Sequence, residues 1–310
     1  MQNIISKKRT FLFLIMLIIF STALIVSCRR STTGKTPEFF FKNSKVVELC
    51  KAISNNDEAK IDSLLKQGVD VNSIGKDGMN PLLWALSFND IKTFEMVLKK
   101  GGNPNIRLTK GNGTSVMILV SKMPENDFLK LTLKYGGDPN IEDFAFKTPL
   151  FHVISSDETS LEKVKILIDS GGDVNNQDIT DRTPAMYAAA LNQYHIVYYL
   201  LKNGGDIRLK DNANNSLIYY IKNSYQNMLK SGKLYDYLMK CVELIKKDGT
   251  KIDLNKKPKS NYEKLPEDWK EKRRALGKEK EQKRQQNLKE SGSKIKPTID
   301  ASEAFKQSAK

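Results

Sequence analysis

Histidine and cysteine are scarce in this chain, which has two His and three Cys among its 310 residues. Three Cys cannot build a disulfide framework. Neither His152 nor His195 has a Cys, Asp or Glu at a spacing typical of metal ligands, and both are expected to be ordinary helix residues. Segment 110–115, KGNGTS, lacks the strand and helix that flank a phosphate-binding loop. We therefore predict no metal, no cofactor and no catalytic residue, and expect that the protein is not an enzyme.

Long apolar runs are also missing, except at the N-terminus. Three basic residues there precede an uncharged stretch of 17 residues, 11–27. This length is short for a bilayer span, for which about 20 residues are usual, and typical of an export signal. Residues 25–28, IVSC, resemble the lipobox of bacterial lipoproteins, although that family prefers Leu where this chain has Ile25. The resemblance implies a signal peptide over residues 1–27 and acylation of Cys28. An uncleaved anchor helix and ordinary signal cleavage are the alternatives.

Acidic residues are too few to balance the basic ones. The chain has 36 Asp and Glu against 51 Lys and Arg, a formal net charge of +15. The excess is confined to the flanks, because residues 46–253 contain 26 basic and 26 acidic residues. A basic total often indicates nucleic acid as a partner. Here the charge lies at the chain ends and the N-terminus predicts export, so no nucleic-acid partner is expected.

Between the flanks, a glycine recurs every 33 to 35 residues. The column contains Gly68, Gly101, Gly136, Gly171 and Gly204. The residues seven, four and three positions before each Gly are apolar, with the single exception of Thr132. These offsets lie on one face of a helix, so each unit is predicted to end in a helix with one buried stripe. The Gly then supplies the left-handed conformation that closes the helix.

A second column marks the start of the first helix in each unit. It contains Asn80, Thr114, Thr148, Thr183 and Ser216. Their side chains are N-cap acceptors for first-turn amides, and Pro follows three of them, at the helix position where a missing N–H costs nothing. Each unit is therefore predicted to be a turn, a short helix, a loop, a second helix and a glycine stop. One such unit buries too little apolar surface to be stable alone, so neighbouring units must stack.

Units of about 33 residues that contain KTPLFHVI (147–154), RTPAMYAA (182–189) and GGDVN (171–175) resemble the ankyrin repeat. The resemblance covers residues 44–254 and implies an all-α solenoid of helix–loop–helix units with β-hairpin turns. We expect six units, at about 44–75, 76–108, 109–143, 144–178, 179–208 and 209–254.

Two of these units depart from the pattern. The third has Ser115 where Pro is expected and an extra residue before Thr114, and the sixth carries about eleven extra residues around 224–237. The stripe of the sixth unit is expected to return seven, four and three residues before Asp248. Because Cys50 falls in the first unit and Cys241 in the last, these two thiols are not expected to pair.

Two flanking segments complete the expected organisation. Residues 28–43 are predicted to be a linker between the membrane anchor and the repeats. Over residues 255–310 the apolar periodicity fades, so this basic tail is predicted to be a single charged helix or disordered. One alternative is that Leu265 and Trp269 dock on the last unit as a cap. The other is that the basic face contacts anionic lipid or glycan.

Ankyrin-like proteins usually bind partners through their hairpin tips and the concave face of their first helices, so the resemblance implies a protein-binding surface. Matched position by position, the candidate residues are Lys76, Asp77, Met79, Phe88, Lys110, Asn112, Phe144, Lys147, Ile179, Thr180, Arg182, Leu191, Asn212 and Asn215. Four of them, Phe88, Phe144, Ile179 and Leu191, are apolar at positions expected to be exposed. Such residues are typical of an interaction surface, and the alternative is that they pack on neighbouring hairpins.

Together these features predict an exported, membrane-anchored, monomeric protein that binds a protein partner on the non-cytoplasmic side of the cell envelope, facing the periplasm or at the cell surface. Two narrower roles are open, neutralisation of a toxic effector and interaction with host or neighbouring proteins. The alternative is a structural envelope protein that binds a polyanion through its basic tail.

Overall fold

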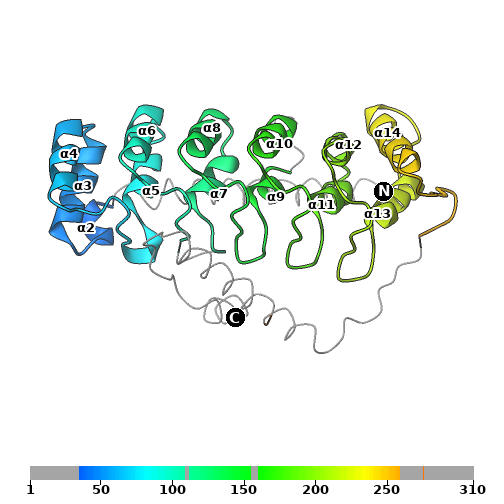
Figure 1. The fold of residues 1–310 in the computed structure, drawn as a ribbon, viewed down its shortest axis with the longest axis horizontal. Coiled ribbons are helices and arrows are strands. Elements are labelled where there is room, and N and C mark those ends of the chain that lie inside the picture. The colour runs from blue at the N-terminus through cyan, green and yellow to red at the C-terminus, as the bar shows by residue number, and fades with distance from the viewer. Residues whose placement is uncertain (1–34, 109–111, 155–159, 259–274, 276–310) are drawn as a thin grey trace, which may run out of the picture. The chain divides into compact units, whose positions relative to one another are not determined.

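The computed structural model describes residues 35–108, 112–154 and 160–258, together with residue 275. This part of the chain is helical, and its β-bridges are isolated pairs, Arg107 with Ser115 and Lys210 with Ser216. It forms two compact units divided between Asn103 and Pro104. In both units consecutive helices pack in pairs (Figure 1), so the expected all-α repeat architecture is confirmed.

The first unit contains a single helical turn followed by two helix pairs. Its elements are α2 (Pro37–Phe40), α3 (Ser44–Ser54), α4 (Glu58–Lys66), the 3-10 turn η1 (Lys76–Gly78), α5 (Pro81–Leu86) and α6 (Ile91–Lys99). The second unit contains four pairs. Its elements are α7 (Val116–Ser121), α8 (Asp127–Lys134), α9 (Pro149–Val153), α10 (Ser160–Asp169), α11 (Pro184–Ala190), α12 (Tyr194–Lys202), α13 (Leu217–Asn227) and α14 (Lys233–Lys247).

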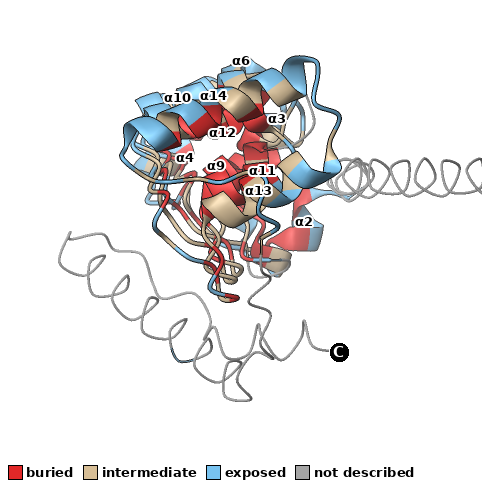
Figure 2. Cartoon of the chain, turned by 90° about the vertical axis from the view of Figure 1, so that its right-hand side faces the viewer, coloured by how far each residue is buried: buried red, intermediate tan, exposed pale blue. Residues whose placement is uncertain are grey.

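In the second unit the first helices of the pairs form one layer and the second helices form another. Helices α7, α9, α11 and α13 form one layer, with hairpin loops on one side and α8, α10, α12 and α14 on the other (Figure 1). The outward sides of α10 and α14 are exposed, whereas the sides that face the first helices are buried (Figure 2). The core of this unit therefore lies between the two layers.

The buried stripe of the second helices lies where the glycine spacing predicts. Side chains seven and four residues before each Gly, from Ile61 and Leu64 to Val197 and Leu200, are at most 1% exposed. The residues three before each Gly are half-buried, apart from Leu98, which is buried. Successive residues of a helix are about 100° apart, so this position lies about 100° from the residue four before the Gly and falls at the edge of the stripe.

The five column glycines have φ between 84° and 90°, as a left-handed helix stop requires. The sixth unit differs from the prediction by one residue. Asp248 is the C-cap of α14, and Gly249, with φ 82°, takes the glycine position. Val242 therefore corresponds to Val197, and Cys241 to Ile196.

Both described cysteines are buried and free. The Sγ of Cys241 lies 3.5 Å from the carbonyl oxygen of Tyr194, and burial raises the pKa of the Cys241 thiol to about 12. Burial also raises the pKa of the Cys50 thiol. Both thiols therefore act as small core residues.

Most of the predicted N-caps are confirmed, and one is corrected. Asn80, Thr148, Thr183 and Ser216 are the N-cap residues of α5, α9, α11 and α13. The side chains of Asn80 and Thr183 accept a hydrogen bond from a first-turn amide as predicted, whereas those of Thr148 and Ser216 do not. In the third unit Thr114 is not the cap. Ser115 occupies that place, and its hydroxyl accepts a hydrogen bond from the N–H of Ile118 at 3.3 Å. The extra residue of this unit is thus accommodated in the hairpin before the helix.

Consecutive repeats are coupled by an asparagine side chain. This asparagine stands four residues after the column glycine of its repeat. In the second unit the amide of Asn175 donates to the carbonyl of Gly204 at 2.9 Å and accepts from the N–H of Asp206 at 2.7 Å. Asn72, Asn105 and Asn140 make the same pair of bonds to the next repeat. Arg208 interrupts the series and pairs instead with Asp248, at 2.9 Å.

The start of the described chain is more ordered than a linker. Pro37–Phe40 form α2, within the segment 28–43 that is predicted to be a linker. Phe40 and Phe41 are 6% and 5% exposed. A Cβ added to Gly75 would lie 2.6 Å from the carbonyl oxygen of Phe40 and 2.8 Å from the ring of Phe41. These side chains therefore cover the N-terminal end of the first unit's core, and Gly75 is required for their close approach.

Thr132, the one polar residue of the stripe, provides a stability test. Its side chain is fully buried, and its hydroxyl has no hydrogen-bond partner in the described part of the chain. An unpaired buried hydroxyl costs about 1–3 kcal/mol. We expect that Thr132→Val raises the free energy of unfolding by about 1 kcal/mol. Urea denaturation measures it. A loss of stability would show that the hydroxyl is hydrogen-bonded in solution.

Several predictions concern residues outside the described ranges. They are the signal peptide over 1–27, the acylated Cys28, the candidate Lys110, and the tail with Leu265 and Trp269. In the ranges that are described, no helix is long and apolar enough to cross a membrane.

Candidate binding surface

Three consecutive hairpins of the second unit are each built around a buried aspartate. The residues are Asp143, Asp178 and Asp211, which are 4%, 1% and 8% exposed. In each hairpin one carboxylate oxygen accepts from the backbone N–H groups two and four residues later, at 2.8 to 3.1 Å. Bonds of this charge-assisted kind are stronger than neutral ones. They hold the residue at the turn, Phe146, Asp181 or Asn214, at φ of 57° to 60°.

The hairpin tips are also bonded to one another in sequence order. The N–H of Phe144 donates to the carbonyl of Asn112 at 2.8 Å, and the N–H of Ile179 donates to Ala145 at 2.8 Å. The N–H of Asn212 donates to Thr180 at 3.0 Å. The four tips therefore have a fixed register, and side chains on successive hairpins keep fixed neighbours.

The second carboxylate oxygen of each aspartate contacts a different side chain. Asp143 lies 3.0 Å from Nε2 of His152, Asp178 lies 3.1 Å from a terminal nitrogen of Arg182, and Asp211 accepts from the hydroxyl of Tyr220 at 2.6 Å. His152 and Tyr220 are both the fourth residue after their helix N-cap. This position of the first helices thus faces the hairpins.

Burial and hydrogen bonding shift the pKa values of this cluster. Burial lowers the pKa of His152, although the bond to Asp143 opposes the shift. Burial would raise the pKa of Asp143, but its bonds to His152 and to backbone amides outweigh burial and lower it. Burial raises the pKa of Tyr220, and its bond to Asp211 adds to the shift. At neutral pH Asp143 is ionised and Tyr220 keeps its proton, so the hydrogen bonds described above are those of the neutral-pH protein.

Tyr187 of α11 occupies the same helix position as His152 and is flanked by two cations. The ammonium of Lys147 lies 4.6 Å from its ring centroid, and the guanidinium carbon of Arg182 lies 5.3 Å away. The ring of Phe151 meets it edge-on at 5.7 Å. The two cations come from successive hairpins, each from the residue before a helix N-cap. A cation over an aromatic face is stabilised by about 0.5–1 kcal/mol at an exposed site.

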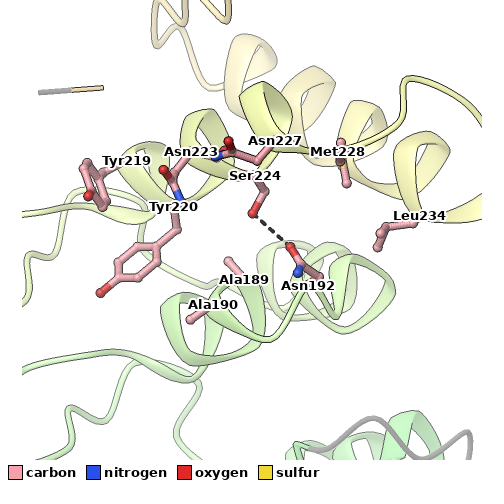
Figure 3. Close-up of a pocket in the computed structure, with 10 residues that line it drawn as sticks. All are labelled: Ala189, Ala190, Asn192, Tyr219, Tyr220, Asn223, Ser224, Asn227, Met228 and Leu234. Atoms are coloured by element: carbon pink, nitrogen blue, oxygen red, sulfur yellow. Dashed lines mark hydrogen bonds between the residues drawn. The ribbon is translucent and has the colours of Figure 1, made fainter. Parts of the chain in front are cut away.

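A pocket of about 310 Å³ lies between the end of α11 and α13. Figure 3 shows Tyr220, Asn223 and Ser224 of α13 above Ala190 and Asn192, with a hydrogen bond of 3.0 Å from Ser224 to Asn192. The extra residues of the sixth unit help to form this pocket. They lengthen α13 to 11 residues and α14 to 15, and they contribute Met228 and Leu234 to the lining.

Comparison with known families matches both halves of the repeat region. A model of ankyrin repeats (many copies) matches residues 49–98, and a model of ankyrin repeats (3 copies) matches residues 116–211. The chain carries ankyrin repeats. No curated protein matches the sequence.

Solved ankyrin-repeat structures share the fold. An ankyrin repeat domain from Acinetobacter baumannii AYE has a TM-score of 0.52 and 22% identity, and the match covers 66% of this chain and 98% of that one. The ankyrin repeat domain of Bcl-3, a member of the IkappaB protein family, has a TM-score of 0.52 and 17% identity, with 66% and 86% covered. The ankyrin repeat protein EF0377 has a TM-score of 0.51 and 22% identity, with 64% and 97% covered. At these identities the likeness concerns the fold alone.

The ankyrin hairpins of the second unit contain most of the predicted surface residues. Lys147 and Arg182 lie together against Tyr187, and Thr180 Oγ1 accepts from Nε of Arg182 at 2.8 Å. Asn112 and Asn212 take part in the tip-to-tip bonds described above. Asn215 is buried, 4% exposed, and its N–H donates to Asp211. It is therefore part of the hairpin frame and not of the accessible surface.

The four apolar candidates divide into two groups. Phe88 and Leu191 are 44% and 43% exposed, and Phe88 meets the ring of Trp84 at 5.5 Å. Phe144 and Ile179 are less exposed, and both are half-buried. The ring of Phe144 lies directly on the backbone of the preceding hairpin, where a Cβ on Gly113 would come within 2.6 Å of it. Packing on the neighbouring hairpin therefore describes Phe144 better than free exposure does.

The remaining candidates belong to the first unit. Met79 is 5% exposed and buried in the core, so it is not available to a partner. Lys76 is exposed, with its ammonium 4.2 Å from the ring centroid of Phe39. Asp77 has φ 62° and forms the turn of η1. The first unit thus offers Lys76 and Phe88 as accessible side chains.

The buried aspartates and the rings of Tyr187 and Tyr220 were not predicted from the sequence. A signal for the aspartates exists, because Asp143, Asp178 and Asp211 each stand five residues before an N-cap. The same spacing in the second repeat falls on Gly75, against which Phe40 and Phe41 pack. The described ranges contain no group of three His, Cys, Asp or Glu that could hold a metal ion.

Proposed function

We propose that the protein is a non-catalytic binding module that holds a protein partner on the hairpins and first helices of its ankyrin repeats. The observation that carries this proposal is the fixed array around Tyr187. Two cations from successive hairpins lie on one half-buried ring, and buried carboxylates and tip-to-tip bonds hold those hairpins in place. A preorganised surface loses little conformational entropy on binding, and Arg and Tyr are the residues that most often dominate interface energies.

Partner binding can be tested by incorporating a photo-crosslinking amino acid at one position of the full chain, expressed in its own cells. At Leu191, next to the pocket, we expect crosslinks to a partner protein. The matched position is Lys165 on α10, which is also exposed but lies in the outer helix layer. Equal crosslinking at both positions, or crosslinking at Lys165 alone, would place the contact elsewhere and contradict the proposal.

We further propose that the module is exported and anchored to the membrane on the non-cytoplasmic side through Cys28. The N-terminal residues 1–27 and the lipobox-like IVSC support this, and the role is then neutralisation of an incoming effector or interaction with host or neighbouring proteins. Two or three acyl chains anchor a protein stably, whereas one is marginal.

The anchoring prediction is tested at Cys28. Cys28→Ala should block lipid attachment and leave a longer precursor that still carries residues 1–27. Labelling with a fatty-acid analogue and electrophoresis measure both effects, and Cys50→Ala is the control because that thiol is buried in α3. Equal lipid labelling of wild type and Cys28→Ala would rule out this anchor.

The basic tail favours a second candidate, a structural envelope protein that binds a polyanion. Residues 255–310 contain 17 Lys and Arg and 9 Asp and Glu. Binding of this kind is salt-dependent and is lost when the tail alone is deleted. Binding through the ankyrin surface survives deletion of residues 259–310, so this deletion separates the two candidates.

A further inference from the structure

The two charged side chains that contact the ring of Tyr187 are both cations. We call Lys122, Lys147 and Arg182, with the ring of Tyr187, the cationic strip. In the described part of the chain no carboxylate lies within ion-pair distance of Lys122 or Lys147, and Arg182 pairs only with Asp178. Lys122 belongs to the same cluster, because Asp143 and Lys147 both act on its charge and burial lowers its pKa.

The carboxylates near the strip do not cancel this charge for an incoming ligand. Asp143, Asp178 and Asp211 are at most 8% exposed, and both oxygens of each already accept hydrogen bonds from the hairpins or first helices. Asp181, at the turn directly before Arg182, is half-buried. Arg182 has five N–H donors, and its contacts to Asp178 and Thr180 use two of them. It therefore keeps donors for a second carboxylate.

The strip continues into the pocket between α11 and α13. Ala190, which lines the pocket, follows Tyr187 by three residues on α11, so the two residues lie on neighbouring positions of the same helix face. The pocket combines the apolar side chains of Ala190, Met228 and Leu234 with the amides of Asn223 and Asn227 (Figure 3). Such a lining suits an apolar side chain together with the peptide groups on either side of it.

We propose that this surface binds an extended acidic segment of a partner protein. Its Asp or Glu side chains meet Lys122, Lys147 and Arg182, and a neighbouring apolar side chain enters the pocket. This inference rests on the proposed function and names the chemistry of the partner. A peptide fits better than a nucleic acid or polyphosphate, because a phosphate polymer has no apolar side chain for Met228 and Leu234 to cover.

The test is a selection of peptides from a random library displayed on phage, with the full chain in detergent as the target. Lys147→Glu/Arg182→Glu reverses two charges of the strip and keeps the basic flanks, so peptides that bind those flanks should bind this variant and the wild type equally. Lys165→Glu is the matched control. It reverses one charge, at a lysine that also lies over a tyrosine ring, Tyr199 at 5.7 Å, but on α10.

We expect the selected peptides to be rich in Asp and Glu and to carry a large apolar residue. Their affinity should fall by about tenfold or more in the charge-reversal variant and remain unchanged in Lys165→Glu. Ala190→Trp, an exposed position that fills the pocket, should also weaken binding by about tenfold. Retained melting temperatures show that the variants are folded.

Three results would overturn the inference. Neutral or basic selected peptides that are lost in Ala190→Trp would refute the acidic partner and leave the proposed function intact. Equal affinity for the wild type and all three variants would refute this surface, and with it the proposed function. Displacement of the peptides by polyphosphate, together with indifference to Ala190→Trp, would identify a phosphate polymer as the ligand.

Discussion

Leu200→Ala is expected to lower the free energy of unfolding by about 2–5 kcal/mol, the cost of removing a fully buried Leu side chain from a core. Leu200 is 0% exposed in α12, four residues before Gly204. Helix α12 packs between α11 and α14, so the cavity would open in the core of the second unit. Urea denaturation measures the loss.

The location of this loss is as informative as its size. Ankyrin-type repeats interact mainly with their nearest neighbours, so hydrogen exchange should increase first in α11–α14 and least in α3–α6. Leu201→Ala is the control, because Leu201 is half-buried in the same helix. A smaller loss for Leu200 than for Leu201 would mean that the buried face of α12 is assigned wrongly.

Asp178→Ala is expected to cost about 2–3 kcal/mol, because hydrogen bonds to a charged group contribute about 1.5–3 kcal/mol. The substitution removes the acceptor of the N–H groups of Thr180 and Arg182 and the ionic partner of the Arg182 side chain. We therefore expect a lower melting temperature and faster amide exchange over residues 178–182.

The matched variant Asp178→Asn separates the two roles of this carboxylate. It keeps one oxygen for the backbone amides and loses the charge that holds Arg182, so it should cost clearly less stability than Asp178→Ala. It should still weaken partner binding, because Arg182 is no longer fixed beside Tyr187. Equal stability of wild type and Asp178→Ala would show that the hairpin does not depend on its buried aspartate.

The repeat architecture could be predicted from the sequence because its signals are local. The spacing from Val164 and Leu167 to Gly171 places one face of one helix in the core, whatever else the chain does. The positive φ of Gly171 and the N-cap at Thr183 likewise depend on a few adjacent residues. Where the local signal was ambiguous, at Thr114 and Ser115, the predicted N-cap was wrong by one residue.

The surface could not be predicted in the same way, because exposure depends on residues far apart in the sequence. For Phe144, exposure at a hairpin tip and packing on the neighbouring hairpin were both open, and its ring packs on Gly113 of the preceding repeat. Met79 was assigned to the surface, and it is buried. The sequence by itself gives no distance between such positions, so it left exposure and packing as equal alternatives.

Sequence alone determined that this protein is a series of helix pairs that end at glycines, because helix periodicity and capping act over single turns of the chain. Tertiary structure decided which charges are available to a partner. Asp143, Asp178 and Asp211 are withdrawn from solvent by the amides of their own hairpins, whereas Lys147 and Arg182, from different repeats, converge on Tyr187. That outcome requires residues about 35 positions apart to lie side by side, and only the stacking of repeats brings them together.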